Sequence, residues 1–150
     1  MSFRNVAAFA LFALASTAGD LSAQVSRTYY GGRSPADGNV APFSGAVQVG
    51  NTLYLSGMLG LDPGQQRPAT AEAEARNVLG AMRSALEAAG MTMDDLVMVQ
   101  VHSSDVSDYA AFNDVYRTFF TTEFPARAFL GAGTLLFDAR FEVLGVAVRR

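Results

Sequence analysis

The stretch Phe124-Pro125-Ala126-Arg127-Ala128-Phe129-Leu130, with Glu142 fifteen positions after its arginine, is the part of the chain around which the rest is interpreted. Proline is tolerated just before a strand or at its first residue, so the pattern predicts a strand over 126–131. Successive side chains in a strand point to opposite faces, which places Arg127 on the same side as Phe129. The other side carries only apolar residues: Ala126, Ala128 and Leu130.

Glu142 lies in a second expected strand, 140–148, whose side it shares with three apolar residues, Leu144, Val146 and Val148. A charge buried alone on an apolar strand is costly, so both Arg127 and Glu142 need a partner. A guanidinium binds a carboxylate through two parallel hydrogen bonds, which suggests a carboxylate-bearing ligand for Arg127. Alternatively, Arg127 and Glu142 satisfy each other as a structural ion pair. These two residues alone leave both interpretations open.

The composition excludes several kinds of chemistry. The chain has 150 residues, a net charge of −3 and a pI near 5.0, which favours a single domain and argues against nucleic acid as a partner. It contains no Cys and no Lys, so it has no disulfide, no thiolate nucleophile and no Schiff-base or P-loop lysine. Its single histidine, His102, cannot form a multi-histidine zinc site. We therefore expect no metal and no cofactor.

The first 23 residues have the pattern of a secretory signal peptide, with Arg4 ahead of an apolar core over 6–15. This core is too short to span a bilayer, which needs about 20 apolar residues. Cleavage is expected after Ala18 or Ala23, although an N-terminal core helix is the alternative. The sequence thus predicts a periplasmic or secreted protein that has no stable membrane association once the signal is removed.

Beyond the signal, an extended lead-in is expected over 24–40 and one folded domain over 41–150. Period-two alternation predicts five strands: 46–49, 52–56, 97–102, 126–131 and 140–148. The two residues Gly50 and Asn51 predict a tight hairpin between the first two strands.

Two amphipathic patterns predict helices. The first begins at Thr70 as N-cap and ends at Gly90, with its core stripe made by Val78, Leu79, Met82, Leu86 and Ala89. The second is expected to be capped by Ser107, with Asn113 at the edge of its buried face. That buried face consists of Tyr109, Phe112, Tyr116, Phe119 and Phe120.

These elements predict an α+β domain, a mixed sheet with two helices on one face. The helices can cover only one face, yet residues on both faces of the sheet are apolar, so a partner subunit is expected on the second. Arg127 and Glu142 are then expected at or near that interface, where clefts for small ligands often form.

Several pieces of the chain, in one register over 34–150, resemble the RidA (YjgF) family of reactive-intermediate deaminases. They are Ala41-Pro42-Phe43-Ser44, Asn51 with Leu55-Ser56-Gly57, Asn113-Asp114-Val115-Tyr116-Arg117-Thr118-Phe119-Phe120, Phe124-Pro125-Ala126-Arg127 and Val146-Ala147-Val148-Arg149-Arg150. The resemblance implies a chorismate-mutase-like fold and a homotrimer with clefts between subunits. It also implies that Arg127 binds the substrate carboxylate and that Glu142 positions or activates water. Three further residues are implied to line the cleft, Ser56, Gly57 and Asn113, and Phe129 is implied to contribute backbone contacts to the substrate.

Phe43 departs from the family pattern, because members commonly carry a tyrosine there that could orient substrate or water. Phe129 also stands where a cysteine is frequent, which makes the expected cleft more apolar.

The family's activity implies hydrolysis of 2-enamine or 2-imino acid intermediates to 2-oxoacids and ammonia. The missing hydroxyl and the expected export favour an alternative, a non-catalytic trimer that binds small carboxylates. Ribonuclease activity, reported for some relatives, is disfavoured by the acidic pI and the lack of lysine.

Overall fold

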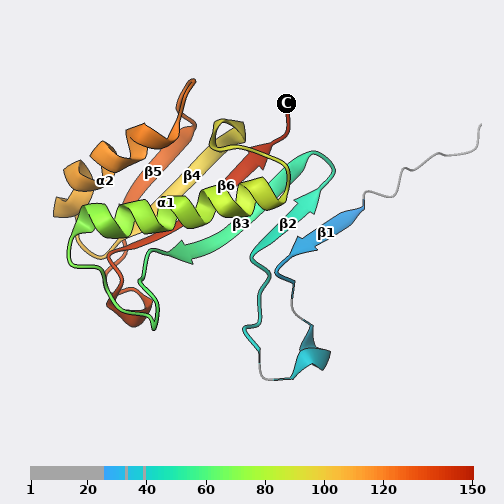
Figure 1. Ribbon diagram of the computed structural model, residues 1–150, viewed down its shortest axis with the longest axis horizontal. Helices are drawn as coiled ribbons and strands as arrows, with labels where there is room; N and C mark the ends of the chain where they lie inside the picture. Colours follow the sequence, from blue (N-terminus) through green and yellow to red (C-terminus); the bar gives the residue numbers. More distant parts are fainter. Residues whose placement is uncertain (1–25, 33, 39) are drawn as a thin grey trace, which may run out of the picture.

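The computed structural model describes residues 26–32, 34–38 and 40–150, so the expected signal peptide over 1–23 lies outside the described residues. These described residues form six strands and two α-helices (Figure 1). The strands are β1 Arg27–Tyr30, β2 Ala46–Val49, β3 Thr52–Leu59, β4 Leu96–Ser103, β5 Ala126–Gly131 and β6 Phe141–Val148. The helices are α1 Ala71–Ala88 and α2 Tyr109–Tyr116, with short 3-10 turns at Pro35–Asp37, Met93–Asp95, Val106–Asp108, Arg117–Phe119 and Leu136–Asp138.

All six strands belong to one sheet in the order β1-β2-β3-β6-β4-β5. Only the β4–β5 pair is parallel, because the chain passes through α2 between these strands, and the sheet is therefore mixed. The expected hairpin is confirmed, since Val49 pairs with Thr52 across Gly50 and Asn51. Part of the expected lead-in adds an edge strand, β1, which pairs antiparallel with β2. Strand β5, which carries Arg127, forms the opposite edge.

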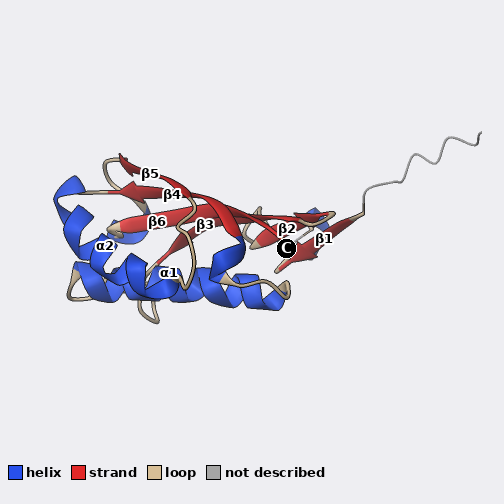
Figure 2. Cartoon of the chain, turned by 90° about the horizontal axis from the view of Figure 1, so that it is seen from above, coloured by secondary structure: helices blue, strands red, loops and turns tan. Residues whose placement is uncertain are grey.

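Both helices lie on the same face of the sheet, which leaves the other face uncovered (Figure 2). This two-layer arrangement confirms the predicted α+β class. The core lies between the layers, where α1 buries Val78, Leu79, Met82 and Leu86 against Phe141, Val143 and Ala147 of β6. Within the described residues, no helix is both long and apolar enough to cross a membrane.

Helix α1 begins as the sequence predicts, because the side chain of Thr70 accepts a hydrogen bond from the backbone N–H of Ala73. Its first turn also contains Glu74, which is completely buried rather than a surface charge. The Glu74 carboxylate accepts hydrogen bonds from the backbone N–H groups of Arg140 and Phe141 and forms a 3.0 Å ion pair with the Arg140 side chain. This contact fixes the start of β6 to α1.

The predicted start of the second helix is wrong. Asp105, not Ser107, is the capping residue: its carboxylate accepts a hydrogen bond from the Ser107 N–H and opens the 3-10 turn that precedes α2. The chain therefore turns before Ser107, and the N-cap position of α2 itself falls on Asp108, whose side chain makes no capping hydrogen bond. Tyr109 is also not part of the buried face, since half of its surface is exposed.

The alternation in the last two strands is confirmed. Arg127 and Phe129 point toward the helices, where both approach the Phe112 ring. On β6, the residues between those of the core are Glu142, Leu144, Val146 and Val148, which point to the uncovered face. Much of that face is apolar and carries the exposed side chains of Tyr54 and Leu130, but His102 of β4 is directly opposite Glu142.

Candidate functional site

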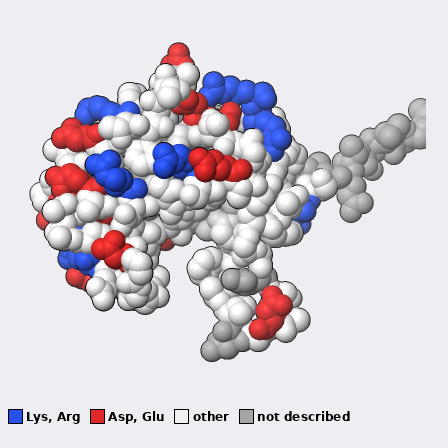
Figure 3. Space-filling view, in the orientation of Figure 1, with Lys and Arg blue, Asp and Glu red and all other residues white. Residues whose placement is uncertain are grey.

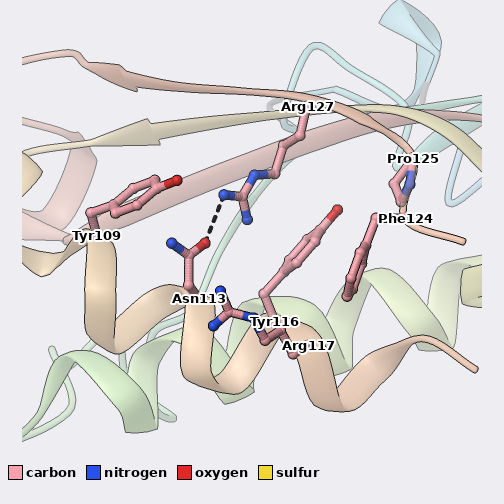
Figure 4. A pocket seen from close by; sticks show the side chains of 7 residues that line it. All are labelled: Tyr109, Asn113, Tyr116, Arg117, Phe124, Pro125 and Arg127. Atoms are coloured by element: carbon pink, nitrogen blue, oxygen red, sulfur yellow. Dashed lines mark hydrogen bonds between the residues drawn. The ribbon is translucent and has the colours of Figure 1, made fainter.

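A cleft of about 290 Å³ opens at the edge of the sheet between β5 and α2. Figure 4 shows Arg127 reaching from the sheet toward α2, with side chains of the helix on the other side of the cleft. The lining residues are Tyr109, Asn113, Tyr116, Arg117, Phe124, Pro125 and Arg127. Two of the predicted site residues, Arg127 and Asn113, are therefore brought together here.

Arg127 is held by contacts from α2. One guanidinium nitrogen donates a 2.6 Å hydrogen bond to Oδ1 of the buried Asn113 (Figure 4). The guanidinium carbon lies 4.5 Å from the ring centroid of Tyr116, at cation–π distance. Among the residues that the structure describes, no Asp or Glu carboxylate forms a salt bridge with Arg127. The positive charge is thus fixed in place and still free to bind an anion.

Tyr116, like Asn113, lines the cleft although it is almost fully buried. Burial raises the pKa of its phenol to about 12, and the nearby positive charge of Arg127 only partly opposes this rise. The hydroxyl is therefore neutral, and a hydrogen-bond donor, throughout the physiological pH range.

Phe129, a predicted site residue, lies beside this cleft rather than among its lining residues. Its ring packs edge-on against Tyr109, with centroids 5.1 Å apart, and against Phe112 at 5.6 Å. Since it fills the space beneath the cleft with an aromatic ring, its side chain supports the cleft floor.

The other predicted site residues surround Glu142 on the uncovered face. Phe43, Ser56, Gly57 and Glu142 line one hollow of about 690 Å³. A Cβ at Gly57 would lie 2.1 Å from Oε1 of Glu142, so the carboxylate occupies the space that any side chain at position 57 would need. The Ser56 hydroxyl donates a 2.6 Å hydrogen bond to the carbonyl of Ser44 and is committed to the loop that carries Phe43.

Sequence reasoning missed the apolar rim of this hollow. Leu136 and Phe137 come from the 3-10 turn before β6, and both are largely exposed. Phe137 has a φ of +56°, a left-handed conformation that is unusual for a bulky residue and is frequent at functional sites. No sequence signal marked this turn, because the conformation of Phe137 depends on the flanking contacts; one of these is the 2.9 Å ion pair between Asp138 and Arg67.

Arg127 and Glu142 do not meet within one chain. Their strands carry them on opposite faces of the sheet, and Arg127 is bonded to Asn113 instead. The interpretation of these residues as a mutual structural ion pair is therefore wrong for the single chain. The alternation of side chains shows which residues of one strand share a face of the sheet. Whether residues of two different strands share a face depends on the register in which the strands pair.

Among the described residues, no group of three or more His, Asp or Glu side chains is arranged to hold a metal ion. On the face that bears the helices, arginine and acidic side chains are interspersed rather than gathered in one basic surface (Figure 3).

Comparison with known proteins places this chain in a family. A model described as Endoribonuclease L-PSP matches residues 34–149, and the chain belongs to this family, which includes RidA and YjgF. The 2-iminobutanoate/2-iminopropanoate deaminase of Capra hircus is 37% identical over 86% of this chain and 94% of its own length.

Solved structures agree with this placement. The YjgF gene product from E. coli has a TM-score of 0.70 at 34% identity, covering 74% of this chain and 91% of its own. E. coli TdcF with bound serine has a TM-score of 0.70 at 28% identity, covering 75% of this chain and 92% of its own.

Proposed function

We propose that this protein hydrolyses 2-imino acids, or the 2-enamines that tautomerise to them, to 2-oxoacids and ammonia. The observation that carries the proposal is Arg127: a guanidinium fixed by Asn113 and Tyr116, at an open cleft, without a carboxylate partner among the described residues. The deaminase names of curated relatives support the reaction type. The serine bound to TdcF supports a small ligand of the amino-acid class.

In this reaction Arg127 binds the carboxylate of the imino acid through charge-assisted hydrogen bonds, worth about 1.5–3 kcal/mol. The water oxygen bonds to the imine carbon as the C=N π bond breaks, and one water proton passes to the nitrogen, which gives a carbinolamine. The hydroxyl proton of the carbinolamine then passes to the nitrogen, the C–N bond breaks, and ammonia leaves as the C=O bond forms, so the balance needs only water. Because imines hydrolyse unaided in water, holding the substrate and water in the correct orientation is most of the catalysis.

Glu142 is proposed to orient the attacking water. Its carboxylate lies beside Gly57 in a hollow with an apolar rim, and His102 of β4 is directly opposite it in the sheet. The ring of Phe43 lines the same hollow but offers no hydroxyl for this task.

Since Arg127 and Glu142 point to opposite faces of one sheet, we propose that a complete site combines Arg127 of one subunit with Glu142 of the next in a homotrimer. Two observations support this assembly. Much of the face that carries Glu142 is apolar and no helix covers it, and Arg127 lies on an edge strand where a neighbouring subunit has access. In a cyclic trimer every such edge meets the same neighbouring surface, which gives three equivalent sites.

The second candidate is a non-catalytic carboxylate binder in the periplasm, favoured by the phenylalanine at position 43. Export itself stays a prediction from residues 1–23, and cell fractionation of the tagged full-length chain tests it. Recovery of the protein in the cytoplasmic fraction alone, at full length, would contradict export.

One assay separates the two candidate functions. A 2-imino acid is generated in solution with an amino-acid oxidase, and its disappearance is followed with wild type and with Arg127→Ala. The deaminase predicts faster loss of imine with wild type and a reduction of at least about tenfold in the variant. No acceleration by wild type, together with saturable binding of 2-oxobutanoate, would leave the binder as the function.

A further inference from the structure

The Tyr116 hydroxyl has no hydrogen-bond partner among the described residues, although it is fully buried. Buried hydroxyls in native proteins nearly always have a partner, so an unpaired one requires an explanation. Tyr116 was expected to belong only to the buried face of its helix. A phenylalanine would fill that role equally well and would leave no polar group unpaired.

The position of this hydroxyl suggests its purpose. Tyr116 follows Asn113 by three residues, which places both side chains on the side of α2 that faces Arg127. In Figure 4 the phenol points away from the helix and toward β5, with its oxygen between the Arg127 guanidinium and the Phe124 ring. The hydroxyl and the free guanidinium nitrogens are thus donors that converge on the same end of the cleft.

We propose that Tyr116 donates a hydrogen bond from its hydroxyl to the ligand carboxylate that Arg127 binds, and that it thereby contributes to the specificity of the site. The ligand class rests on the proposed function: a 2-imino acid, or the 2-oxoacid formed from it. A carboxylate has two oxygens and about four acceptor positions, so it can accept from the guanidinium and the phenol together. The raised pKa of Tyr116 agrees with this role, because the phenol keeps its proton.

Phe124 controls access to this donor. Its ring lies 6.2 Å from the Tyr116 ring in a stacked arrangement, and more than half of its own surface is exposed. It belongs to the irregular segment before β5 rather than to a strand or helix. A carboxylate entering beside Arg127 therefore displaces an exposed ring in an irregular segment, not a part of the sheet.

The test uses Tyr116→Phe in the full-length protein, which keeps the ring over Arg127 and removes only the hydroxyl. We expect the Kd for 2-oxobutanoate, measured by titration calorimetry, to rise at least about tenfold, as for the loss of a hydrogen bond to a charged group. The melting temperature of the ligand-free variant should rise by roughly 2–6 °C, because an unpaired buried hydroxyl is removed.

Tyr30→Phe is the matched control. The Tyr30 hydroxyl donates a 2.8 Å hydrogen bond to Oε1 of Gln48, in the β1–β2 pair at the other edge of the sheet from β5. Its loss should lower the melting temperature and leave the Kd unchanged. The two tyrosines are thus expected to give opposite changes in stability, and only Tyr116→Phe should weaken binding.

The outcomes separate this inference from the proposed function. A Tyr116→Phe variant that binds 2-oxobutanoate as tightly as wild type would overturn the inference, even if imine hydrolysis by wild type is confirmed. Wild type that binds 2-oxobutanoate but does not accelerate imine hydrolysis would overturn the proposed function alone. Wild type that neither binds 2-oxobutanoate at millimolar concentration nor accelerates imine hydrolysis would overturn both.

Discussion

Replacing Gly57 with alanine tests the arrangement around Glu142 with a single carbon atom. The added Cβ would lie 2.1 Å from Oε1 of Glu142 and 2.9 Å from its Cδ, whereas ordinary contact begins at 3.4 Å. The carboxylate must therefore move by more than 1 Å. A displacement of this size at a catalytic group costs about 100-fold in rate, so we expect kcat/KM for 2-imino acid to fall by about that factor in Gly57→Ala.

The fold should survive this change, because the clash involves the end of a flexible side chain and not backbone. Gly80→Ala is the matched control: a Cβ at Gly80 meets nothing within 4 Å in the middle of α1, so it should stabilise the protein by about 0.5–1 kcal/mol and leave kcat/KM unchanged. Circular dichroism and thermal unfolding check that each variant is folded.

A double-mutant cycle identifies the origin of the effect. If Gly57→Ala acts by displacing Glu142, it should reduce activity little further in a Glu142→Gln background, since the two changes affect the same group. Full activity in a folded Gly57→Ala variant would refute the reasoning. A 100-fold loss that is retained undiminished in the Glu142→Gln background would refute it as well.

Three further predictions concern stability and the departure at position 43. Glu74→Ala should destabilise the protein by about 3–5 kcal/mol in urea unfolding, because it leaves the largely buried guanidinium of Arg140 without its carboxylate; a loss below about 1 kcal/mol would contradict this. Phe43→Tyr should give a severalfold gain in initial rate by restoring a hydroxyl beside Glu142, and an unchanged rate would show that the phenylalanine does not limit activity. Hydrogen bonds from Thr121 lower the pKa of Asp94 in the folded protein below its unfolded value near 3.8. The ionised Asp94 therefore stabilises the fold above pH 3.8, and this stabilisation is lost as the pH falls through the lower folded pKa. Asp94→Asn should therefore flatten the loss of stability as pH falls below about 4, measured by urea unfolding, and an unchanged slope would argue against this contribution.

Much of the fold could be predicted from periodicity because its determinants are local. The Gly50-Asn51 turn, the Thr70 cap and the alternation around Arg127 each depend on a few adjacent residues. Strand β1 was not predicted as a strand, because it pairs at the edge of the sheet and has no buried face to impose an apolar pattern.

The site was harder to predict because it depends on how elements face one another. Asn113 and Tyr116 are three residues apart, so the helix period alone indicates a shared face, yet only the packed structure shows that this face meets Arg127. Arg127 and Glu142 lie on opposite faces of the sheet because of the register in which β4 pairs with β5 and with β6. The sequence of a single strand does not reveal that register. The burial of Glu74 could not be predicted either. An acidic residue is expected in the first turn of a helix, where it interacts favourably with the helix dipole, so its presence there did not indicate a buried role.

The central claim is that each site takes Arg127 from one subunit and Glu142 from its neighbour, and subunit mixing tests it most directly. Arg127→Ala and Glu142→Gln chains, each nearly inactive alone, are unfolded together in equal amounts and refolded. Random mixing in a cyclic trimer gives an intact pair at about one quarter of the interfaces, so the account predicts about a quarter of the activity of wild type treated in the same way. Activity no greater than that of the two separate variants, in mixed oligomers shown by mass spectrometry to contain both chains, would contradict it.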